Sequence, residues 1–196
     1  MRLVLATANP GKQRELEALL APLGVSLALQ SQLGIKSVAE SGTTFEANAL
    51  LKARHAARVS ALPALADDSG LEVDALGGRP GVWSARYAGD GASDEDNNEL
   101  LLRELRGVPA ERRTARYRCV LVLVRDADDA TPLIAQGSWE GHIGSHPRGQ
   151  SGFGYDPLFV PEGLQVSAAQ LAAEHKNSIS HRGKALASLA AQLGAR

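Results

Sequence analysis

The sequence predicts an α/β fold in a single domain. Short apolar segments alternate with longer segments of helical periodicity, and polar loops follow the apolar segments, as in folds that cover a sheet with helices. The composition is that of an ordinary globular protein, with 44% hydrophobic and 22% charged residues. Because 196 residues suit one large domain and no linker, repeat or low-complexity tract interrupts them, we expect residues 1–196 to form one domain.

The N-terminal half predicts two strands and three helices. Arg2–Ala6 is an apolar run typical of a buried strand, and leucines at helical spacing then predict a helix that ends at Gly24. A second helix is expected after Thr44, whose hydroxyl suits an N-cap. Pro63–Ala66 predicts a brief buried strand, and Ser93–Leu105 predicts a helix with acidic residues in its first turn.

The C-terminal half is richer in strands. Arg116–Arg125, Pro132–Gln136 and Ser138–Ile143 carry enough Val, Leu and Ile to predict strands. The glycine-rich stretch Gly149–Asp156 predicts a loop. Ser180–Leu193 predicts a closing helix with apolar residues on one face.

Charge and cysteine content bound the possible partners and the compartment. A formal net charge of −1 gives no global field for a nucleic acid polymer or an anionic membrane, so neither is an expected partner. Cys119 is alone and can form neither an internal disulfide nor a thiolate zinc site, which fits a reducing compartment. The N-terminus lacks the apolar region of a signal peptide, and no apolar run reaches about 18 residues, so we expect a cytoplasmic protein.

The loop Thr7–Lys12 joins the first predicted strand to the first predicted helix. A Gly-Lys pair at a helix N-terminus offers backbone N–H groups, the positive end of the helix dipole and an ammonium, all of which suit a phosphate. The spacing of a Walker A loop is missing. The alternative is an ordinary turn formed by Asn9, Pro10 and Gly11, with Lys12 in solvent.

Two adjacent carboxylates, Asp67 and Asp68, follow the predicted strand Pro63–Ala66. Carboxylates are costly to bury unless cations or hydrogen-bond donors meet them, and a hard divalent ion such as Mg²⁺ prefers oxygen ligands that it shares with substrate phosphates. The alternative is a surface turn, because residues 67–70 are all turn formers. Glu40, just before the second predicted helix, is a further candidate ligand, with a solvated side chain as its alternative.

Two later segments carry groups that suit a nucleotide base. In Ser151–Asp156, glycines permit close backbone approach, and Phe153 and Tyr155 suit stacking on a base, with a core aromatic between turn glycines as the alternative. Lys176–Arg182 gathers basic and titratable side chains ahead of a predicted helix and suits a phosphate or a base edge. A capped helix start with solvated charges is the alternative there.

Taken together, these segments resemble the inosine and xanthosine triphosphate pyrophosphatase family, whose members remove non-standard purine nucleotides. The matching segments occur in family order over nearly the whole chain: ATANPGK (6–12), SGTTFEANALLKA (41–53), DDSGLEVDALGGRPGVWSARYAG (67–89), SGFGYDPLF (151–159) and KNSISHRGKAL (176–186). The resemblance implies an elongated mixed β-sheet flanked by helices, two lobes with a central nucleotide-binding cleft, and a homodimer.

The resemblance also implies an activity and roles for individual residues. The expected reaction is hydrolysis of XTP, ITP or dITP at the α–β bond, with a nucleoside monophosphate and pyrophosphate as products and Mg²⁺ as cofactor. Asp68 is implied as proton acceptor and, with Glu40, as metal ligand. The residues implied as substrate contacts are Thr7, Ala8, Asn9, Pro10, Gly11, Lys12, Ser69, Phe153, Gly154, Tyr155, Asp156, Lys176, His181 and Arg182. Either Arg182 or a backbone N–H is the expected donor to a 6-keto group of the base.

Several points stay open on sequence alone. The motifs do not fix the order of preference among XTP, ITP and dITP, the choice between Asp67 and Asp68 as proton acceptor, the need for a dimer, or the metal beyond a hard divalent ion. The alternative functions are a pyrophosphatase of another specificity, for modified pyrimidine or standard deoxynucleotides, and a nucleotide-binding sensor without turnover. The adjacent carboxylates favour an enzyme, because a mere binder gains nothing from negative charge beside phosphates.

Overall fold

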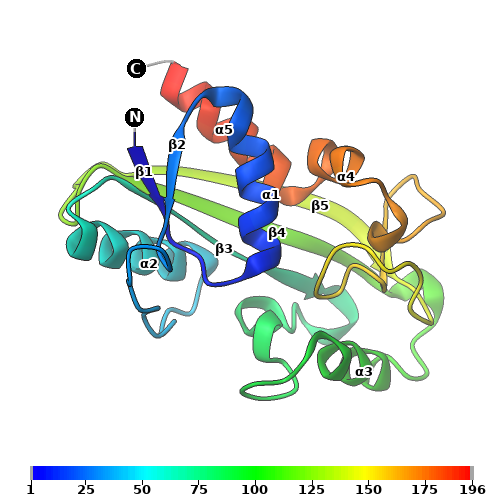
Figure 1. Ribbon diagram of the computed structural model, residues 1–196. Coiled ribbons are helices and arrows are strands. Elements are labelled where there is room, and N and C mark those ends of the chain that lie inside the picture. Colours follow the sequence, from blue (N-terminus) through cyan, green and yellow to red (C-terminus); the bar gives the residue numbers. More distant parts are fainter. Residues whose placement is uncertain (1, 195–196) are drawn as a thin grey trace. The chain divides into compact units, whose positions relative to one another are not determined.

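The computed structural model describes residues 2–194, which form two compact units (Figure 1). The chain passes from one unit to the other and back, so each unit is built from separate stretches. Unit 1 comprises the residues up to Asp68, Cys119–Gly137 and the stretch that starts at Arg182. Unit 2 comprises Ser69–Arg118 and Ser138–His181. That the whole chain acts as a single bilobed domain stays a prediction.

Within residues 2–194, six strands form one mixed sheet. In chain order they are β1 (Arg2–Leu5), β2 (Ser26–Leu29), β3 (Ala64–Val73), β4 (Thr114–Val124), β5 (Leu133–Ile143) and β6 (Phe159–Pro161). The order across the sheet is β2-β1-β3-β4-β5-β6. Strand β1 is parallel to both β2 and β3, whereas β5 and β6 are antiparallel, so the predicted mixed α/β class is confirmed.

Five α-helices accompany the sheet within the same residues. They are α1 (Pro10–Leu20), α2 (Phe45–Ser60), α3 (Asp94–Glu104), α4 (Ala173–Ile179) and α5 (His181–Gly194). Short 3-10 helices occupy Ala21–Leu23, Asp74–Leu76, Gly81–Arg86, Ala110–Arg112 and Ala168–Gln170. The side chains that cap α1, α2 and α3 at their N-termini are those of Asn9, Thr44 and Ser93.

In unit 1, helices cover both faces of the strands. Successive residues of a strand point to opposite faces. Leu3 and Leu5 of β1 lie in a buried cluster with residues of α1 and α5, whereas Val4 lies in a second cluster with residues of α2. Figure 1 shows α2 on the opposite side of the strands from α1 and α5. In β3 the same alternation directs Leu65 toward α1 and α5 and Ala66 toward α2.

Strand β3 extends well beyond the predicted segment Pro63–Ala66 and carries Asp67 and Asp68 in its interior. The interpretation of residues 67–70 as a polar loop at a strand end is therefore wrong. The alternative of a surface turn is also wrong, because Asp67 is 1% and Asp68 5% exposed. The strand continues because groups on both faces of the sheet supply partners for the carboxylates, so tertiary contacts override the turn-forming tendency of Asp, Ser and Gly.

Unit 2 has a buried core of its own, to which Leu71 of β3, Leu101 of α3 and Trp139 of β5 contribute. Helix α3 begins with a capping box: the Ser93 hydroxyl accepts from the Asp96 N–H at 3.1 Å, and the Asp96 carboxylate accepts from the Ser93 N–H at 2.8 Å. The predicted helix with an acidic first turn is thus confirmed, and its apolar face is anchored in this core.

Most of the other predicted elements are confirmed to within a few residues, with three differences. The two strand segments predicted on either side of Gly137 form one continuous strand, β5. Lys176 lies inside α4, although the sequence placed it in a loop ahead of a helix. Strands β2 and β6 were not predicted, because four and three residues give too little pattern to distinguish a strand.

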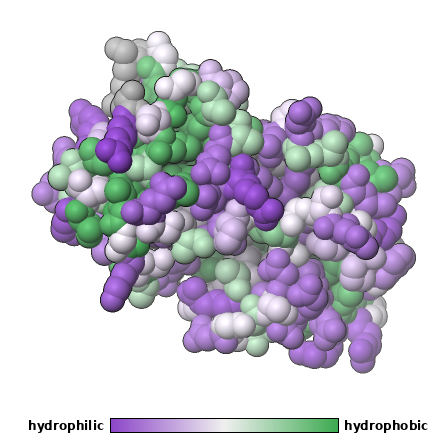
Figure 2. Space-filling model, in the orientation of Figure 1, coloured by the Kyte–Doolittle hydropathy of each residue, from purple (hydrophilic) through white to green (hydrophobic). Residues whose placement is uncertain are grey.

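Apolar residues reach the surface in limited areas. On the face shown in Figure 2, they gather over unit 1 around β1 and β2, and polar residues cover much of the rest of that face. The most exposed large apolar side chains are those of Val59 and Trp83, at 58% and 55%. None of the helices formed by residues 2–194 has the length and apolar character needed to span a bilayer.

A close approach between β5 and β6 predicts that one glycine tolerates no side chain. A Cβ on Gly141 would lie 2.3 Å from the backbone oxygen of Val160. Gly141→Ala should lower the free energy of unfolding by about 1–3 kcal/mol, because overpacking against backbone cannot relax as it can against the end of a side chain. Gly144→Ala is the matched control and should change it by less than about 0.5 kcal/mol, since its nearest neighbour is 3.4 Å away. Urea denaturation measures both, and equal losses would contradict this explanation.

Candidate active site

Strand β3 sends its two adjacent carboxylates to opposite faces of the sheet in unit 1. Asp67 lies two residues after Leu65 and contacts residues of α1 and α5, whereas Asp68 lies two after Ala66 and contacts residues of α2. Each buried carboxylate therefore meets cations or donors from the helices on its own side. The expectation that buried carboxylates at this point need such partners is confirmed.

Asp67 is held by Lys12 of α1 and Arg182 of α5. The Lys12 Nζ lies 3.3 Å from the Asp67 Oδ1, and the Arg182 Nη2 donates to the Asp67 Oδ2 at 3.2 Å. Arg182 also forms an ion pair with Glu15, and its side chain is 1% exposed. The Lys12 side chain is 14% exposed, so the alternative of a solvated lysine at this turn is wrong. A buried charge network thus joins α1, β3 and α5.

The charges around Asp67 fix its protonation state. Burial raises the pKa of Asp67, but attraction to Lys12 and Arg182 outweighs burial and holds that pKa well below its usual value of 3.8. A carboxylate with a depressed pKa binds a proton weakly and is a poor general base at neutral pH. Its contacts favour a structural role, which is to hold the Lys12 ammonium and the Arg182 guanidinium in place.

Asp68 meets Asn48 and Lys52, which lie one turn apart on α2. The Asn48 Nδ2 donates to the Asp68 Oδ2 at 3.2 Å, and the Lys52 Nζ donates to the Asp68 Oδ1 at 2.9 Å. The same ammonium donates to the Glu40 Oε1 at 2.6 Å. One ammonium therefore brings together the two carboxylates that the sequence predicts as metal ligands.

The segment before α2 is fitted closely around Asn48. The Asn48 Oδ1 accepts from the Gly42 N–H at 2.8 Å, so this amide bridges the segment and Asp68. A Cβ on Gly42 would lie 2.7 Å from the same oxygen, so a larger residue would displace the amide. Thr44 then caps α2 through its side-chain oxygen. Together these contacts fix the first turns of α2 against β3.

The environment of Asp68 differs from that of Asp67 in its effect on protonation. Burial raises the pKa of Asp68 above its usual value of 3.8, and the attraction of Lys52 offsets burial only in part. Burial lowers the pKa of Lys52, but the nearby carboxylates outweigh burial and raise it overall, so Lys52 stays charged. Asp68 is therefore the more basic of the two neighbouring carboxylates.

The loop between β1 and α1 is shaped by Asn9. Its Oδ1 accepts from the Gly11 N–H at 2.8 Å and the Lys12 N–H at 3.0 Å, and its own N–H donates to the Thr7 Oγ1 at 3.2 Å. Pro10 is the first residue of the helix, where its missing N–H costs no hydrogen bond. The Gly11 and Lys12 N–H groups, which were expected to suit a phosphate, therefore donate to the Asn9 side chain in this structure. An anion can reach these two N–H groups only by displacing the Asn9 side chain, and the Lys12 ammonium offers it a separate contact.

In unit 2, Asp156 organises the loop that was predicted to hold a base. Its carboxylate pairs with Lys176 and accepts from the Tyr117 hydroxyl at 3.3 Å and from the Phe153 N–H at 3.0 Å. The Lys176 Nζ lies 5.0 Å from the centre of the Phe153 ring, a cation–π arrangement. A Cβ on Gly152 would lie 2.1 Å from the Asp156 Oδ2, so only glycine lets the loop fold over this carboxylate.

The other predicted residues of unit 2 differ in their burial and contacts. The Tyr155 hydroxyl donates to the Ser84 carbonyl at 2.8 Å, and the residue is 3% exposed, so Tyr155 is a core aromatic that anchors the loop. Phe153 is only partly buried and is the ring of this loop that a ligand can reach. His181 stacks on Tyr117 with ring centres 4.7 Å apart. Ser69 follows Asp68 directly in β3.

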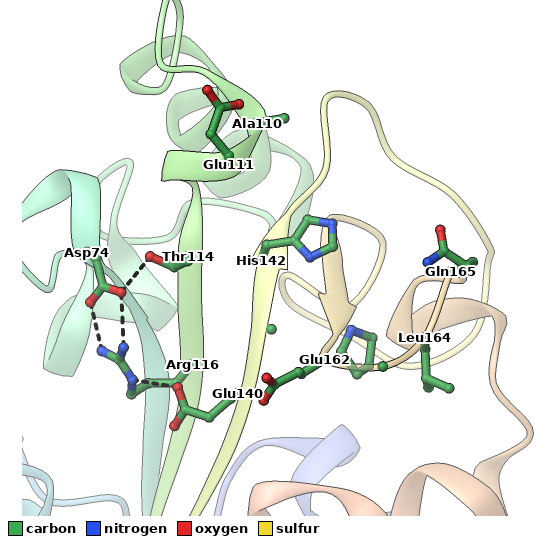
Figure 3. A pocket seen from close by; sticks show the side chains of 13 residues that line it. Asp74, Ala110, Glu111, Thr114, Arg116, Glu140, His142, Glu162, Leu164 and Gln165 are labelled. Carbon is green, nitrogen blue, oxygen red and sulfur yellow. Dashed lines mark hydrogen bonds and ion pairs between the residues drawn. The ribbon is translucent and has the colours of Figure 1, made fainter.

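A separate cavity of about 680 Å³ lies elsewhere in unit 2 (Figure 3). Arg116 is the only Lys or Arg among its lining residues, and its guanidinium is bound by Asp74 and Glu140, each with a shortest distance of 2.9 Å. Glu111 and Glu162 add further negative charge. An anionic ligand would find no unpaired Lys or Arg there, and none of the predicted site residues lines the cavity, so it is not a candidate for this site.

Comparisons with known proteins decide the family. The family model described as Ham1 family matches residues 3–192. The chain belongs to the Ham1 family. A curated dITP/XTP pyrophosphatase of Methylococcus capsulatus is 59% identical over 194 residues, which cover 99% of this chain and 96% of that protein. The dITP/XTP pyrophosphatase of Photobacterium profundum is 56% identical over 193 residues, which cover 98% of each.

Solved structures of Ham1 proteins share the fold. A HAM1 protein from Coxiella burnetii is similar with a TM-score of 0.91 and 43% identity, over 100% of both chains. The Ham1 protein of Staphylococcus aureus gives a TM-score of 0.86 and 38% identity, over 100% of this chain and 99% of that one. These likenesses confirm the resemblance that the sequence motifs indicate.

In this Ham1-family chain the predicted site residues are divided between the two units. Unit 1 holds Thr7, Ala8, Asn9, Pro10, Gly11, Lys12, Glu40, Asp68 and Arg182, and unit 2 holds Ser69, Phe153, Gly154, Tyr155, Asp156, Lys176 and His181. Asn48 and Lys52 share one face of the second predicted helix at a spacing of four residues, but that spacing alone assigns neither residue a role in the site. Glu15 gives no local signal in the sequence, because its partner Arg182 lies at the far end of the chain.

The buried network around Asp67 predicts a large loss of stability when its charge is removed. Asp67→Asn keeps the shape but leaves Lys12 and Arg182 short of a counter-charge, so the free energy of unfolding should fall by about 3–5 kcal/mol. Asp128→Asn is the matched control, because its ion pair with Arg58 joins side chains that are 94% and 65% exposed. That change should cost less than about 1 kcal/mol. Similar losses in the two variants, measured by urea denaturation, would refute a structural role for Asp67.

Proposed function

We propose that this chain hydrolyses the non-standard purine nucleoside triphosphates XTP, ITP and dITP to the monophosphate and pyrophosphate, which removes them from the nucleotide pool. Membership of the Ham1 family supports this proposal. So do relatives named dITP/XTP pyrophosphatase that are 56–59% identical over nearly the whole chain.

The observation that carries the proposal is the setting of Asp68. This buried carboxylate has a raised pKa, an ammonium at 2.9 Å and, through that ammonium, a link to Glu40. A basic carboxylate beside a second carboxylate and a cation suits the removal of a proton from water next to a charged phosphate chain. Asp67, with its depressed pKa and two cationic partners, does not offer this chemistry.

The donor set fits a hard divalent ion, for which we propose Mg²⁺. The Glu40 Oε1 and the Asp68 Oδ1 both accept from the single Lys52 ammonium, so they are placed to share one cation. Residues 2–194 contain no group of three or more His, Cys, Asp or Glu suited to a metal. Magnesium commonly needs only one or two carboxylates, with substrate phosphates and water completing its shell. When bound, Mg²⁺ would neutralise phosphate charge and orient the chain.

The chain's own groups then divide the work at the phosphate end. The Lys12 ammonium, steadied by Asp67, binds the triphosphate beside the start of α1. The Asn9 side chain shapes the loop, and the loop contacts the phosphates through Thr7, Ala8, Asn9, Pro10 and Gly11. Asp68 accepts the proton of the attacking water, and Asn48 and Lys52 hold its carboxylate in one orientation.

The base end is proposed for residues of unit 2. Phe153 stacks on the purine, and Lys176 and Asp156 fix that ring and the backbone beside it. The Arg182 guanidinium is bound to two carboxylates, so a backbone N–H in this loop is the better donor to a 6-keto group. Adenine presents an amino group there and would leave the donor unpaired, which selects against ATP.

We further propose a cytoplasmic homodimer with no nucleic acid polymer or membrane as partner. A net charge of −1 supports the absence of nucleic acid and membrane partners, because it provides no general attraction to polyanions. In this setting the substrate reaches the protein from the nucleotide pool, and recognition depends on the local groups described above.

The products of the reaction test the proposed function directly. Wild-type protein incubated with Mg²⁺ and each of ITP, XTP and dITP should release the monophosphate and pyrophosphate, resolved by ion-exchange chromatography. ATP, GTP and modified pyrimidine triphosphates in the same panel should turn over much more slowly. Primary release of orthophosphate and a diphosphate would overturn the proposal, and tight binding without turnover would identify a sensor.

Asp68→Asn tests the proton acceptor. The change keeps the size of the side chain but removes its charge and basic oxygen, so kcat for ITP should fall by at least about 10²-fold. Folding should survive, because Lys52 keeps Glu40 as a partner and Asp67 faces the other side of the sheet. Asp128→Asn, which alters an exposed carboxylate, should leave kcat unchanged. A folded Asp68→Asn variant with near-normal turnover at saturating Mg²⁺ would rule out this assignment.

A further inference from the structure

We propose that Asp94 and Asn98 of α3 are positioning residues that clamp the backbone of Gly154 and thereby set where the Phe153 ring meets the base. This inference rests on the proposed function and deepens it. It gives a role in substrate recognition to two residues outside the motifs that define the predicted site.

The clamp consists of hydrogen bonds to both polar backbone groups of Gly154. The Asp94 Oδ2 accepts from the Gly154 N–H at 2.6 Å, and the Asn98 Nδ2 donates to the Gly154 carbonyl at 2.9 Å. The Asn98 Nδ2 also donates to the Asp94 carbonyl at 2.8 Å. Two carbonyl partners fix the orientation of this amide, and Asn98 as a whole is 7% exposed. Helix α3 therefore holds one residue of the loop from both sides.

The loop depends on such contacts because glycine leaves its backbone free to adopt other conformations. Gly152 and Gly154 have φ angles of 79° and 61°, in the left-handed region, and glycine loses more conformational entropy on ordering than any other residue. Packing does not replace the clamp on the side of α3. A cavity of about 480 Å³ there is lined by Asp94, Asn98 and Leu102 as well as by the loop.

The three acidic residues at the start of α3 differ in their side-chain contacts, which provides the control. Asp96 completes the capping box with Ser93, and Asp94 binds the loop. The Glu95 side chain is exposed and makes no hydrogen bond or ion pair with any residue in the described part of the chain. Asp94→Ala and Glu95→Ala thus remove the same charge from the same helical turn, and only the first removes a contact to the loop.

The expected effect of Asp94→Ala is on nucleotide binding. KM for ITP should rise by about 5–10-fold with kcat changed by less than about 2-fold, because a misplaced stacking ring weakens ground-state and transition-state binding alike. The inhibition constant of pyrophosphate should stay the same, because the residues that we propose to bind phosphate belong to unit 1. Asp94→Asn retains an acceptor for the Gly154 N–H and should recover most of the loss. Lys12→Ala should differ from Asp94→Ala in weakening inhibition by pyrophosphate as well as raising KM for ITP.

A second measurement reports on the clamp without turnover. The Gly154 amide should exchange with solvent faster in Asp94→Ala than in wild type or Glu95→Ala. Asn98→Asp, which sets a carboxylate against two carbonyl oxygens, should have the same effect. Unchanged KM for ITP with unchanged Gly154 exchange, or equal effects in Asp94→Ala and Glu95→Ala, would overturn the inference. A wild-type protein that releases no pyrophosphate from ITP would instead contradict the proposed function, and amide exchange would still decide whether the clamp exists.

Discussion

The alternation of side chains along β3 is the constraint on which the candidate site depends. Asp67 and Asp68 are adjacent, so a shift of one residue in the pairing of β3 would exchange the faces to which they point. The register is pinned by apolar residues: Leu5 pairs with Leu65, and both belong to the cluster that contains α1 and α5. The core pattern of unit 1 thereby decides which carboxylate faces which helix.

Two chemically identical side chains acquire different properties from this arrangement. Asp67 faces Lys12 and Arg182, which stabilise its negative charge. Its pKa is therefore low, and the carboxylate is a weak base. Asp68 faces the Asn48 amide and Lys52, and Lys52 is shared with Glu40. Burial raises the pKa of Asp68, so this carboxylate is the more basic of the two. The first carboxylate joins the elements of unit 1, and the second is the one for which we propose chemistry beside a metal and a phosphate chain.

Much of the fold follows from the sequence, because caps, turn glycines and apolar periodicity are local, whereas the candidate site residues follow from the resemblance of the motifs to a family. The caps Thr44 and Ser93 and the buried strand around Cys119 are of this kind. The course of β3 through Asp67 is not, since its turn formers stay extended only where distant cations bind them. The pairing of Arg182 with Glu15, 167 residues apart, is equally invisible to any local pattern. Nor does an acidic first turn of α3 reveal that Asp94 reaches Gly154.

The most direct test of this division of roles is the titration of the two carboxyl groups in the metal-free protein. Carbon-13 NMR of aspartate side chains, assigned with Asp67→Asn and Asp68→Asn, would follow each carboxyl as the pH falls. The Asp68 carboxyl should titrate above the usual value of 3.8, and the Asp67 carboxyl should remain ionised well below it. The reverse order, or two carboxyl groups that titrate together near the usual value, would contradict the assignment of Asp67 to structure and Asp68 to proton transfer.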